Sequence, residues 1–130
     1  MDMNDFYYEC TRDGNVIRFK LTGFIIANKI RHLQEAIISE LKSLEGKPFK
    51  IFFDFRGLKA LDPRAAMALK EIGDYLYDSS AIKVGTVFDN VLPKLQHLRL
   101  IKDGKAQESI NAGRAKIFSN ADECLAWLEA

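Results

Sequence analysis

The pattern of hydrophobic and polar positions predicts a two-stranded hairpin at the start of the chain. Residues 6–11 (FYYECT) are mostly apolar, and residues 16–21 (VIRFKL) alternate between apolar and polar side chains. Such alternation is typical of a strand with one buried and one solvated face. Asp13 and Gly14 between the two segments favour a tight turn. We therefore expect an antiparallel pair near the edge of a sheet.

The period then changes to that of a helix. Over residues 29–44 the apolar side chains recur at helical spacing, which predicts an amphipathic helix with one buried stripe. The stripe consists of Ile30, Leu33, Ile37, Leu41 and Leu44. Gly46 favours the end of this helix, and Pro48 prevents its continuation.

A strand, a loop and a helix over residues 49–80 form the centre of the chain. Residues 50–55 (KIFFDF) are almost continuously apolar, as in a strand that is buried on both faces. After Gly57 and a short loop, Asp62 is placed to cap a helix, and Pro63 suits its first position. The predicted buried stripe of this helix is Ala65, Leu69, Ile72 and Leu76, widened by Ala66, Met67 and Tyr75.

The remaining segments continue the alternation of strands and helices. Residues 81–88 and 115–118 read as strands, and Gly85 marks a bulge or a close approach of backbone. Residues 91–101 read as a helix capped by Asp89 or Asn90, and residues 105–111 as a second short helix after it. The predicted buried face of the helix at 91–101 consists of Val91, Leu95, Leu98 and Ile101. The last helix, capped by Ser119 or Asn120, should direct Ala121, Cys124, Leu125 and Leu128 inward.

These elements predict a single α/β domain over residues 1–130. The order is β-β-α-β-α-β-α-β-α, with the short helix at 105–111 added to the third crossover. Strands that alternate with helices imply a mainly parallel sheet with right-handed crossovers and helices packed on it, here with an antiparallel hairpin at the N-terminus.

Composition and charge narrow the classes of function. The 130 residues are 48% hydrophobic and 28% charged, with a net charge of +1, which gives no electrostatic footprint for nucleic acid. No apolar run is long enough to cross a membrane. Residues 1–5 show no secretion signal, and Cys10 and Cys124 are expected to be free thiols. We therefore expect a cytoplasmic protein.

Three stretches of the chain resemble the STAS domain, the module of anti-sigma-factor antagonists and sulfate transporters. Residues 16–44 are similar to the strand, Leu-x-Gly turn and first helix of that family, with LTG at 21–23. Residues 49–69 are similar to its strand, Asp, loop and second helix, and residues 115–128 to its closing strand and helix. The resemblance implies the SpoIIAA-like fold and a regulatory role through protein partners.

The sequence departs from this family at one functional position. Members that are switched by phosphorylation carry Ser or Thr directly after the Asp that starts the second helix. Here Pro63 and Arg64 follow Asp62, and neither accepts a phosphate. This departure predicts no phosphorylation site at the helix start, and it makes the chain more similar to a bacterial branch of the same fold that is described as STAS/Sec14-like.

The candidate functional residues lie where the central strand ends. In open α/β sheets, binding crevices form at this edge. The candidate binding residues are Asp54, Arg56, Lys59, Asp62, Pro63 and Arg64. Asp54 and Asp62 could form an acid–base or metal-binding pair, but the favoured interpretation is that Asp54 accepts from loop amides and Asp62 caps the helix. Arg64 and Lys59 could hold an anion, although an exposed arginine in a first helical turn is more often solvated.

The functional hypotheses rank an interaction module first and an enzyme last. His32 and His97 read as surface residues on different helices, and the sequence contains none of the GxGxxG, Walker A, HExxH or GxSxG motifs. We expect no cofactor and no metal. The leading hypothesis is a non-enzymatic module that binds a protein partner through residues 57–66. The alternative is a carrier or sensor of an apolar or anionic small molecule at the same edge of the sheet.

Overall fold

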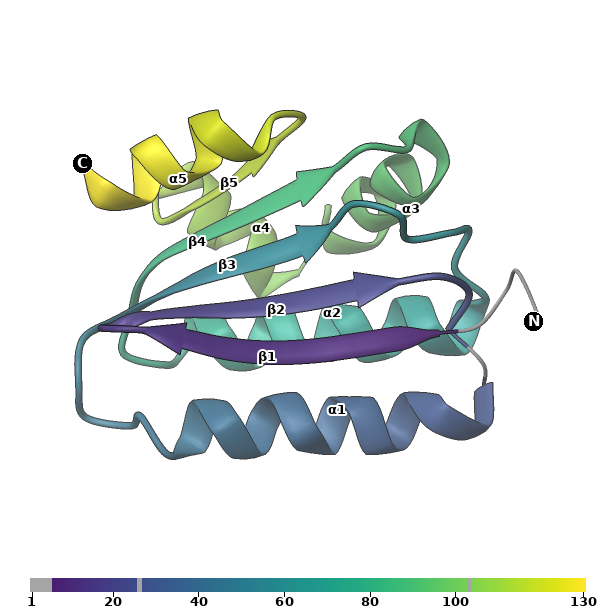
Figure 1. Ribbon diagram of the computed structural model, residues 1–130, viewed down its shortest axis with the longest axis horizontal. Coiled ribbons are helices and arrows are strands. Elements are labelled where there is room, and N and C mark those ends of the chain that lie inside the picture. The colour runs from purple at the N-terminus through teal and green to yellow at the C-terminus, as the bar shows by residue number, and fades with distance from the viewer. Residues whose placement is uncertain (1–5, 26, 103) are drawn as a thin grey trace.

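The computed structural model describes residues 6–25, 27–102 and 104–130, and it has the α/β architecture expected from the sequence (Figure 1). Its five strands follow the chain order across the sheet, β1-β2-β3-β4-β5, with β1 antiparallel to β2 and all other neighbours parallel. The strands are β1 (Tyr7–Asp13), β2 (Val16–Thr22), β3 (Phe49–Phe55), β4 (Ala81–Phe88) and β5 (Ala115–Phe118). The helices are α1 (Ala27–Lys42), α2 (Pro63–Tyr77), α3 (Val91–Ile101), α4 (Lys105–Asn111) and α5 (Ala121–Glu129).

The opening hairpin lies at one edge of the sheet, as predicted. Asp13 faces Val16 in the register, so Gly14 and Asn15 form a two-residue turn. Gly14 has a φ of 63°, which is why the turn favours glycine at this position. On β2 the residues alternate between buried and half-buried, so the alternating sequence pattern is confirmed.

β3 occupies the middle of the sheet and is covered on both faces. Every residue of the strand except Lys50 is buried, which explains the almost uninterrupted apolar sequence. The predicted central position of this strand is therefore confirmed.

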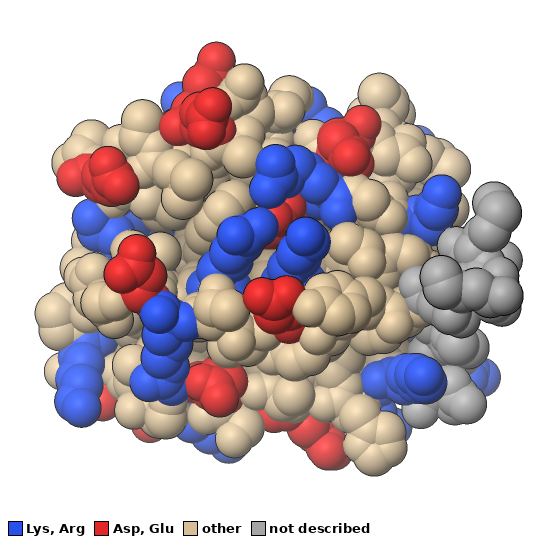
Figure 2. Space-filling view, viewed as in Figure 1, with Lys and Arg blue, Asp and Glu red and all other residues tan. Residues whose placement is uncertain are grey.

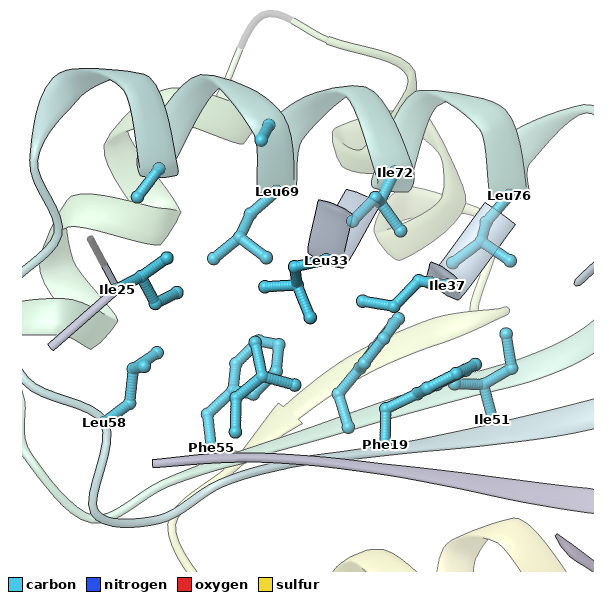
Figure 3. Packing of buried hydrophobic residues seen from close by; sticks show 14 of the residues in the cluster. Phe19, Ile25, Leu33, Ile37, Ile51, Phe55, Leu58, Leu69, Ile72 and Leu76 are labelled. Atoms are coloured by element: carbon cyan, nitrogen blue, oxygen red, sulfur yellow. The ribbon is translucent and has the colours of Figure 1, made fainter. Parts of the chain in front are cut away.

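The larger core lies between the sheet and the helices α1 and α2, as Figure 3 shows. Phe19, Ile51 and Phe55 of the sheet face Leu33, Ile37, Leu69, Ile72 and Leu76 of these two helices. The predicted stripes of both helices are confirmed, with two differences. Leu44 follows the end of α1 and is only half-buried, and Met67 is 47% exposed rather than packed in the core. On α2 the buried stripe widens toward Ala66 and Ala68, which leaves Met67 on the outer side of the helix.

The helix α5 covers the opposite face of the sheet over β3, β4 and β5 (Figure 1). Phe52, Val87 and Phe118 pack there against Cys124 and Leu128. A Cβ atom on Gly85 would lie 2.5 Å from the Cys124 sulfur, so the expected close approach at this glycine is confirmed. Burial raises the pKa of Cys124 to about 11, which makes this thiol unreactive.

The same helix touches the sheet along a narrower line than the sequence predicted. The nine-residue α5 buries Cys124 and Leu128, which lie one turn apart. Leu125 is 38% exposed and Ala121 is half-buried, so the inward position expected for Leu125 is wrong.

The helix α3 also buries a different face from the one expected. Ile101 and Pro93 are buried and Leu98 is half-buried, but Val91 and Leu95 are 68% and 51% exposed. The helix packs mainly beside α2, and its buried side chains are Pro93 in the first turn and Ile101 in the last. The apolar residues Val91, Leu92 and Leu95 lie on the outer side of the helix and are exposed.

Candidate functional site

The loop after β3 is fixed by backbone hydrogen bonds to the end of β2. The Gly23 amide donates to the Gly57 carbonyl at 3.0 Å, and the Lys59 amide donates to the Gly23 carbonyl at 2.9 Å. Leu58 is fully buried below these contacts, whereas Lys59 is exposed. The Gly57 amide donates to the Asp89 carboxylate at 2.9 Å, which ties the loop to the end of β4. These hydrogen bonds fix the position of the loop relative to the ends of β2 and β4.

The start of α2 is equally well ordered by local contacts. The Asp62 carboxylate accepts from the Ala65 amide at 2.8 Å and caps the helix, as the sequence predicted. Pro63 occupies the first helical turn, where its missing N–H leaves no hydrogen bond unmade. The side chains of Pro63 and Arg64 both point to solvent.

The Gln96 side chain of α3 forms two hydrogen bonds with the backbone at this junction. The Gln96 side-chain oxygen accepts from the Leu61 amide at 2.9 Å, and the Gln96 amide nitrogen donates to the Leu61 carbonyl at 3.1 Å. These paired bonds place the exposed apolar residues of α3 beside the loop. We call this region the loop–helix surface; it consists of Lys59, Pro63, Arg64, Met67, Val91, Leu92 and Leu95.

A shallow groove between α1 and α2 adjoins the loop–helix surface. Pro63, Arg64 and Met67 line one side of it, and Ile30 and Arg31 line the other. Gln34 and Glu71 extend the lining, so the groove has apolar, cationic and anionic side chains. Its residues span from the first turns to the middle of the two helices, whose inner faces pack in the core.

Asp54 and Arg56 form a separate site on the opposite face of the sheet. Asp54 is completely buried, and its carboxylate accepts from Arg18 at 2.5 Å and from two nitrogens of Arg56 at 2.8 Å each. Burial alone would raise the pKa of Asp54, but the hydrogen bonds from Arg56 and Arg18 outweigh this effect and lower the pKa to about 2. Asp54 is therefore ionised at neutral pH.

The two aspartates of the acid–base hypothesis therefore have different partners. Both oxygens of Asp54 are bound by guanidinium groups, and Asp62 caps α2. The Arg56 amide also donates to Asp54 at 3.3 Å, so the expected loop-amide contact is present but is the weaker interaction. Within residues 6–25, 27–102 and 104–130, no group of three or more His, Cys, Asp or Glu side chains could hold a metal ion.

Sequence reasoning missed Arg18 and Lys20 as partners of this site. Arg18 lies across from Phe52, and Lys20 lies directly across from Asp54, in the parallel register of β2 and β3. A signal was present in the sequence, since a carboxylate inside an apolar strand needs a cation on a neighbouring strand. Only the register shows which cations lie on that face.

His97 is another residue whose placement differs from the sequence expectation. Its ring packs against Phe88, with the ring centres 5.6 Å apart, and it lines a small, partly open cavity between the sheet and the helices α2, α3 and α4. Burial lowers the pKa of His97 to about 4, so the ring is neutral near pH 7. The expected surface position is wrong for His97, whereas His32 is exposed.

The cavity beside His97 has a volume of about 60 Å³. Apolar side chains such as Phe53, Ile72 and Ile101 form most of its wall, and Thr86 and Ser109 add hydroxyl groups. None of residues 57–61 lines it. This cavity is therefore distinct from the crevice that the sequence suggested at the end of β3.

The strand order, the antiparallel hairpin and the helices on both faces define a SpoIIAA-like α/β fold. An anti-sigma factor antagonist from Mycobacterium paratuberculosis is similar over 98% of this chain and 97% of its own, with a TM-score of 0.68 and 12% sequence identity. A DUF3478-family protein with a SpoIIAA-like fold from Shewanella loihica PV-4 is similar over 98% of both chains, with a TM-score of 0.65 and 17% identity.

These likenesses confirm the STAS-type fold that the sequence predicted. At the level of sequence, no family profile and no curated protein matches the chain. Among the helices that the structure describes, none has the length and apolar character needed to cross a membrane.

Proposed function

We propose that this chain is a non-enzymatic interaction module that binds a protein partner through the loop–helix surface. The observation that carries the proposal is a fixed junction with exposed apolar and cationic side chains. Met67, Leu92 and Leu95 are each about half exposed, and Lys59 and Arg64 are exposed in the loop and in the first turn of α2. Arginine and methionine are enriched at protein interfaces, and apolar side chains supply the buried area.

The rigidity of the junction supports this proposal. Asp62 caps α2, Gln96 clamps Leu61, and Gly23 and Gly57 join two loops, so the surface is ordered before any partner binds. A pre-organised surface loses less conformational entropy on association. One structural neighbour, from Mycobacterium paratuberculosis, is an anti-sigma factor antagonist, which is also a role in protein binding.

We further propose that the partner is not released by phosphorylation at the start of α2. Pro63 stands after Asp62, and the nearest serines of the helix, Ser79 and Ser80, follow its far end. There the Ser79 hydroxyl donates to Leu76, and the Ser80 hydroxyl donates to Lys47. These two serines cap and link structural elements, so they do not replace a switch residue at the opposite end.

The test is capture of partners from a lysate of cells that contain this protein naturally, with quantification by mass spectrometry. We expect wild-type protein and Lys47→Glu to enrich the same partner, because Lys47 lies at the other end of α2 from the surface. Arg64→Glu and Leu92→Asp should each lose that partner by about tenfold or more, the effect of ~1.4 kcal/mol at an interface. Equal enrichment by all four proteins would exclude the loop–helix surface.

A second candidate is the binding of a small molecule in the cavity beside His97. The mixture of apolar walls with Thr86, Ser109 and His97 favours a ligand with one polar end. Against it, the cavity of about 60 Å³ is far below the ~300–1,000 Å³ of usual ligand pockets. Native mass spectrometry of freshly purified protein tests this candidate, and a mass equal to that of the bare chain counts against it.

A further inference from the structure

Three cationic side chains gather on the face of the sheet that α5 leaves open. Arg18 and Lys20 alternate on β2, so both point to this face, and Arg56 reaches it from the end of β3. β1 and β2 have no helix over them here, and Tyr7, Glu9 and Thr11 of β1 are exposed. Figure 2 shows a cluster of Lys and Arg side chains at the centre of this face.

The cluster contains more positive charge than its internal carboxylate neutralises. Asp54 carries one negative charge and is shared by Arg18 and Arg56. Lys20 lies directly across from Asp54, yet within the part of the chain that the structure describes it forms no ion pair. Lys20 also faces Glu9 of β1, so three cations against the two carboxylates Asp54 and Glu9 leave an excess of one positive charge at the centre of the cluster.

Other carboxylates lie around the cluster and are engaged elsewhere or exposed. Glu9 faces Lys20 across the hairpin and accepts from the Tyr7 hydroxyl at 2.5 Å. The hydrogen bonds to Asp54 raise the pKa of Arg56, and Asp89 and Asp122 lie close enough to add to this effect. Asp89 also accepts from the Gly57 amide. Both carboxylates therefore lie on the Arg56 side of the cluster.

The guanidinium of Arg18 is incompletely paired. It reaches Asp54 through one terminal nitrogen, whereas Arg56 binds the carboxylate through two. The Nε atom of Arg18 is buried and has no hydrogen-bond partner among the described residues. Nevertheless, the Arg18 and Arg56 side chains remain 40% and 43% exposed, so both still present donors to solvent.

We propose that Arg18, Lys20 and Arg56 form a binding site for a phosphate group. Asp54 occupies Nε and one terminal nitrogen of Arg56 and one terminal nitrogen of Arg18, so each guanidinium keeps a second terminal nitrogen for a ligand, and Lys20 supplies an ammonium group at the open side. A phosphate monoester carries about −1.5 to −2 charges at pH 7 and offers three acceptor oxygens to these three side chains, whereas a carboxylate carries one charge and offers two oxygens. Asp54 has the role of holding the two arginines in place.

This site is independent of the proposed interaction surface. Arg18 and Lys20 alternate on β2 with Ile17, Phe19 and Leu21, whose side chains enter the core beneath α1 and α2. The cluster therefore lies on the face opposite those helices. Loss of phosphate binding and loss of a protein partner are consequently separate outcomes.

Nuclear magnetic resonance of the full chain, labelled with ¹⁵N, tests the phosphate site. We expect inorganic phosphate, added at constant ionic strength near pH 7, to shift the side-chain N–H signals of Arg18 and Arg56 in a saturable way. Lys20→Gln should weaken this binding by roughly fivefold or more, as expected for the loss of one charge near an anion in water. Lys42→Gln, which removes the same charge from the exposed end of α1, should leave it unchanged.

Titrations with other anions distinguish an organic phosphate ligand from free phosphate and test the preference for phosphate over carboxylate. Tighter binding of phosphoserine or a phosphorylated sugar than of inorganic phosphate would assign the phosphate to an organic ligand, and the reverse order would assign it to the free ion. Equal binding of acetate would overturn the proposed match to a dianion. No saturable shift in the wild type, or an equal affinity in Lys20→Gln with an unchanged Tm, would overturn the site itself.

Discussion

At the scale of single residues, Asp54 shows how a charge is held inside this sheet. A carboxylate with no exposed surface is unfavourable unless ion pairs and hydrogen bonds replace its water. Arg56 supplies two such bonds and Arg18 supplies one, and together they keep the group ionised. The same pairs position two guanidiniums on an open face, so one buried residue organises a surface site.

The buried ionisable groups make stability depend on pH in two separate windows. Burial lowers the pKa of His97 to about 4, against ~6.5 in an unfolded chain, so the unfolded state binds the proton first. Stability should therefore fall as the pH decreases from about 6.5 to 4. The lowered pKa of Asp54, about 2, adds a further loss between about pH 4 and 2.

We expect His97→Gln to abolish the loss of stability between about pH 6.5 and 4 and to keep the loss between about pH 4 and 2. Urea unfolding at pH 7.0 and 4.5 should show a loss of about 1–3 kcal/mol in the wild type over this range. In the variant, whose overall stability is lower because the ring packs on Phe88, the loss should be clearly smaller. An identical loss in both proteins would show that His97 titrates normally in the folded state. His32→Gln, at an exposed position, is the matched control.

At the scale of elements, the caps were predictable and the buried faces only partly so. Asp62, Asn90 and Asn120 cap α2, α3 and α5 as the sequence indicated, because capping depends on residues within one turn. The predicted buried face of α3 was wrong because it depends on which side of the helix meets α2 and the sheet. The spacing of Val91 and Leu95 suits a core as well as an interaction surface, and only tertiary structure separates the two.

The cap at Asp62 provides a prediction for this scale. Asp62→Ala should destabilise the protein by about 1 kcal/mol, because the Ala65 amide loses its acceptor at the first turn. Asp62→Asn keeps an acceptor in the same place and should cost much less. Chemical denaturation of the three proteins, compared at equal m-values, measures the difference. Equal stability of the alanine and asparagine variants would mean that the cap contributes little.

At the scale of the whole molecule, the sequence predicted the fold better than the site. The alternation of strands and helices and the central place of β3 follow from hydrophobic periodicity, and the structure has both. The candidate residues Asp54, Arg56, Lys59, Asp62, Pro63 and Arg64 adjoin one loop in the sequence. The structure divides them, because Asp54 and Arg56 lie on the face of the sheet opposite α2, whereas the chain after Gly57 leads to the start of α2. Arg18 and Lys20 join the site through strand register, which a single sequence does not reveal.

This layered architecture predicts an order of local stability across the sheet. β3 has a hydrogen-bonded strand on each side and covered faces, whereas β1 lies at the sheet edge with five of its seven residues exposed. Exposure of a β3 amide requires most of the molecule to open, but β1 can separate from β2 locally. Native-state hydrogen exchange should therefore be slowest for the amides of Ile51 and Phe53 and faster, by at least about tenfold, for the hydrogen-bonded amides of β1. The β2 amides serve as the internal comparison, and exchange of β3 as fast as that of β1 would contradict a core centred on this strand.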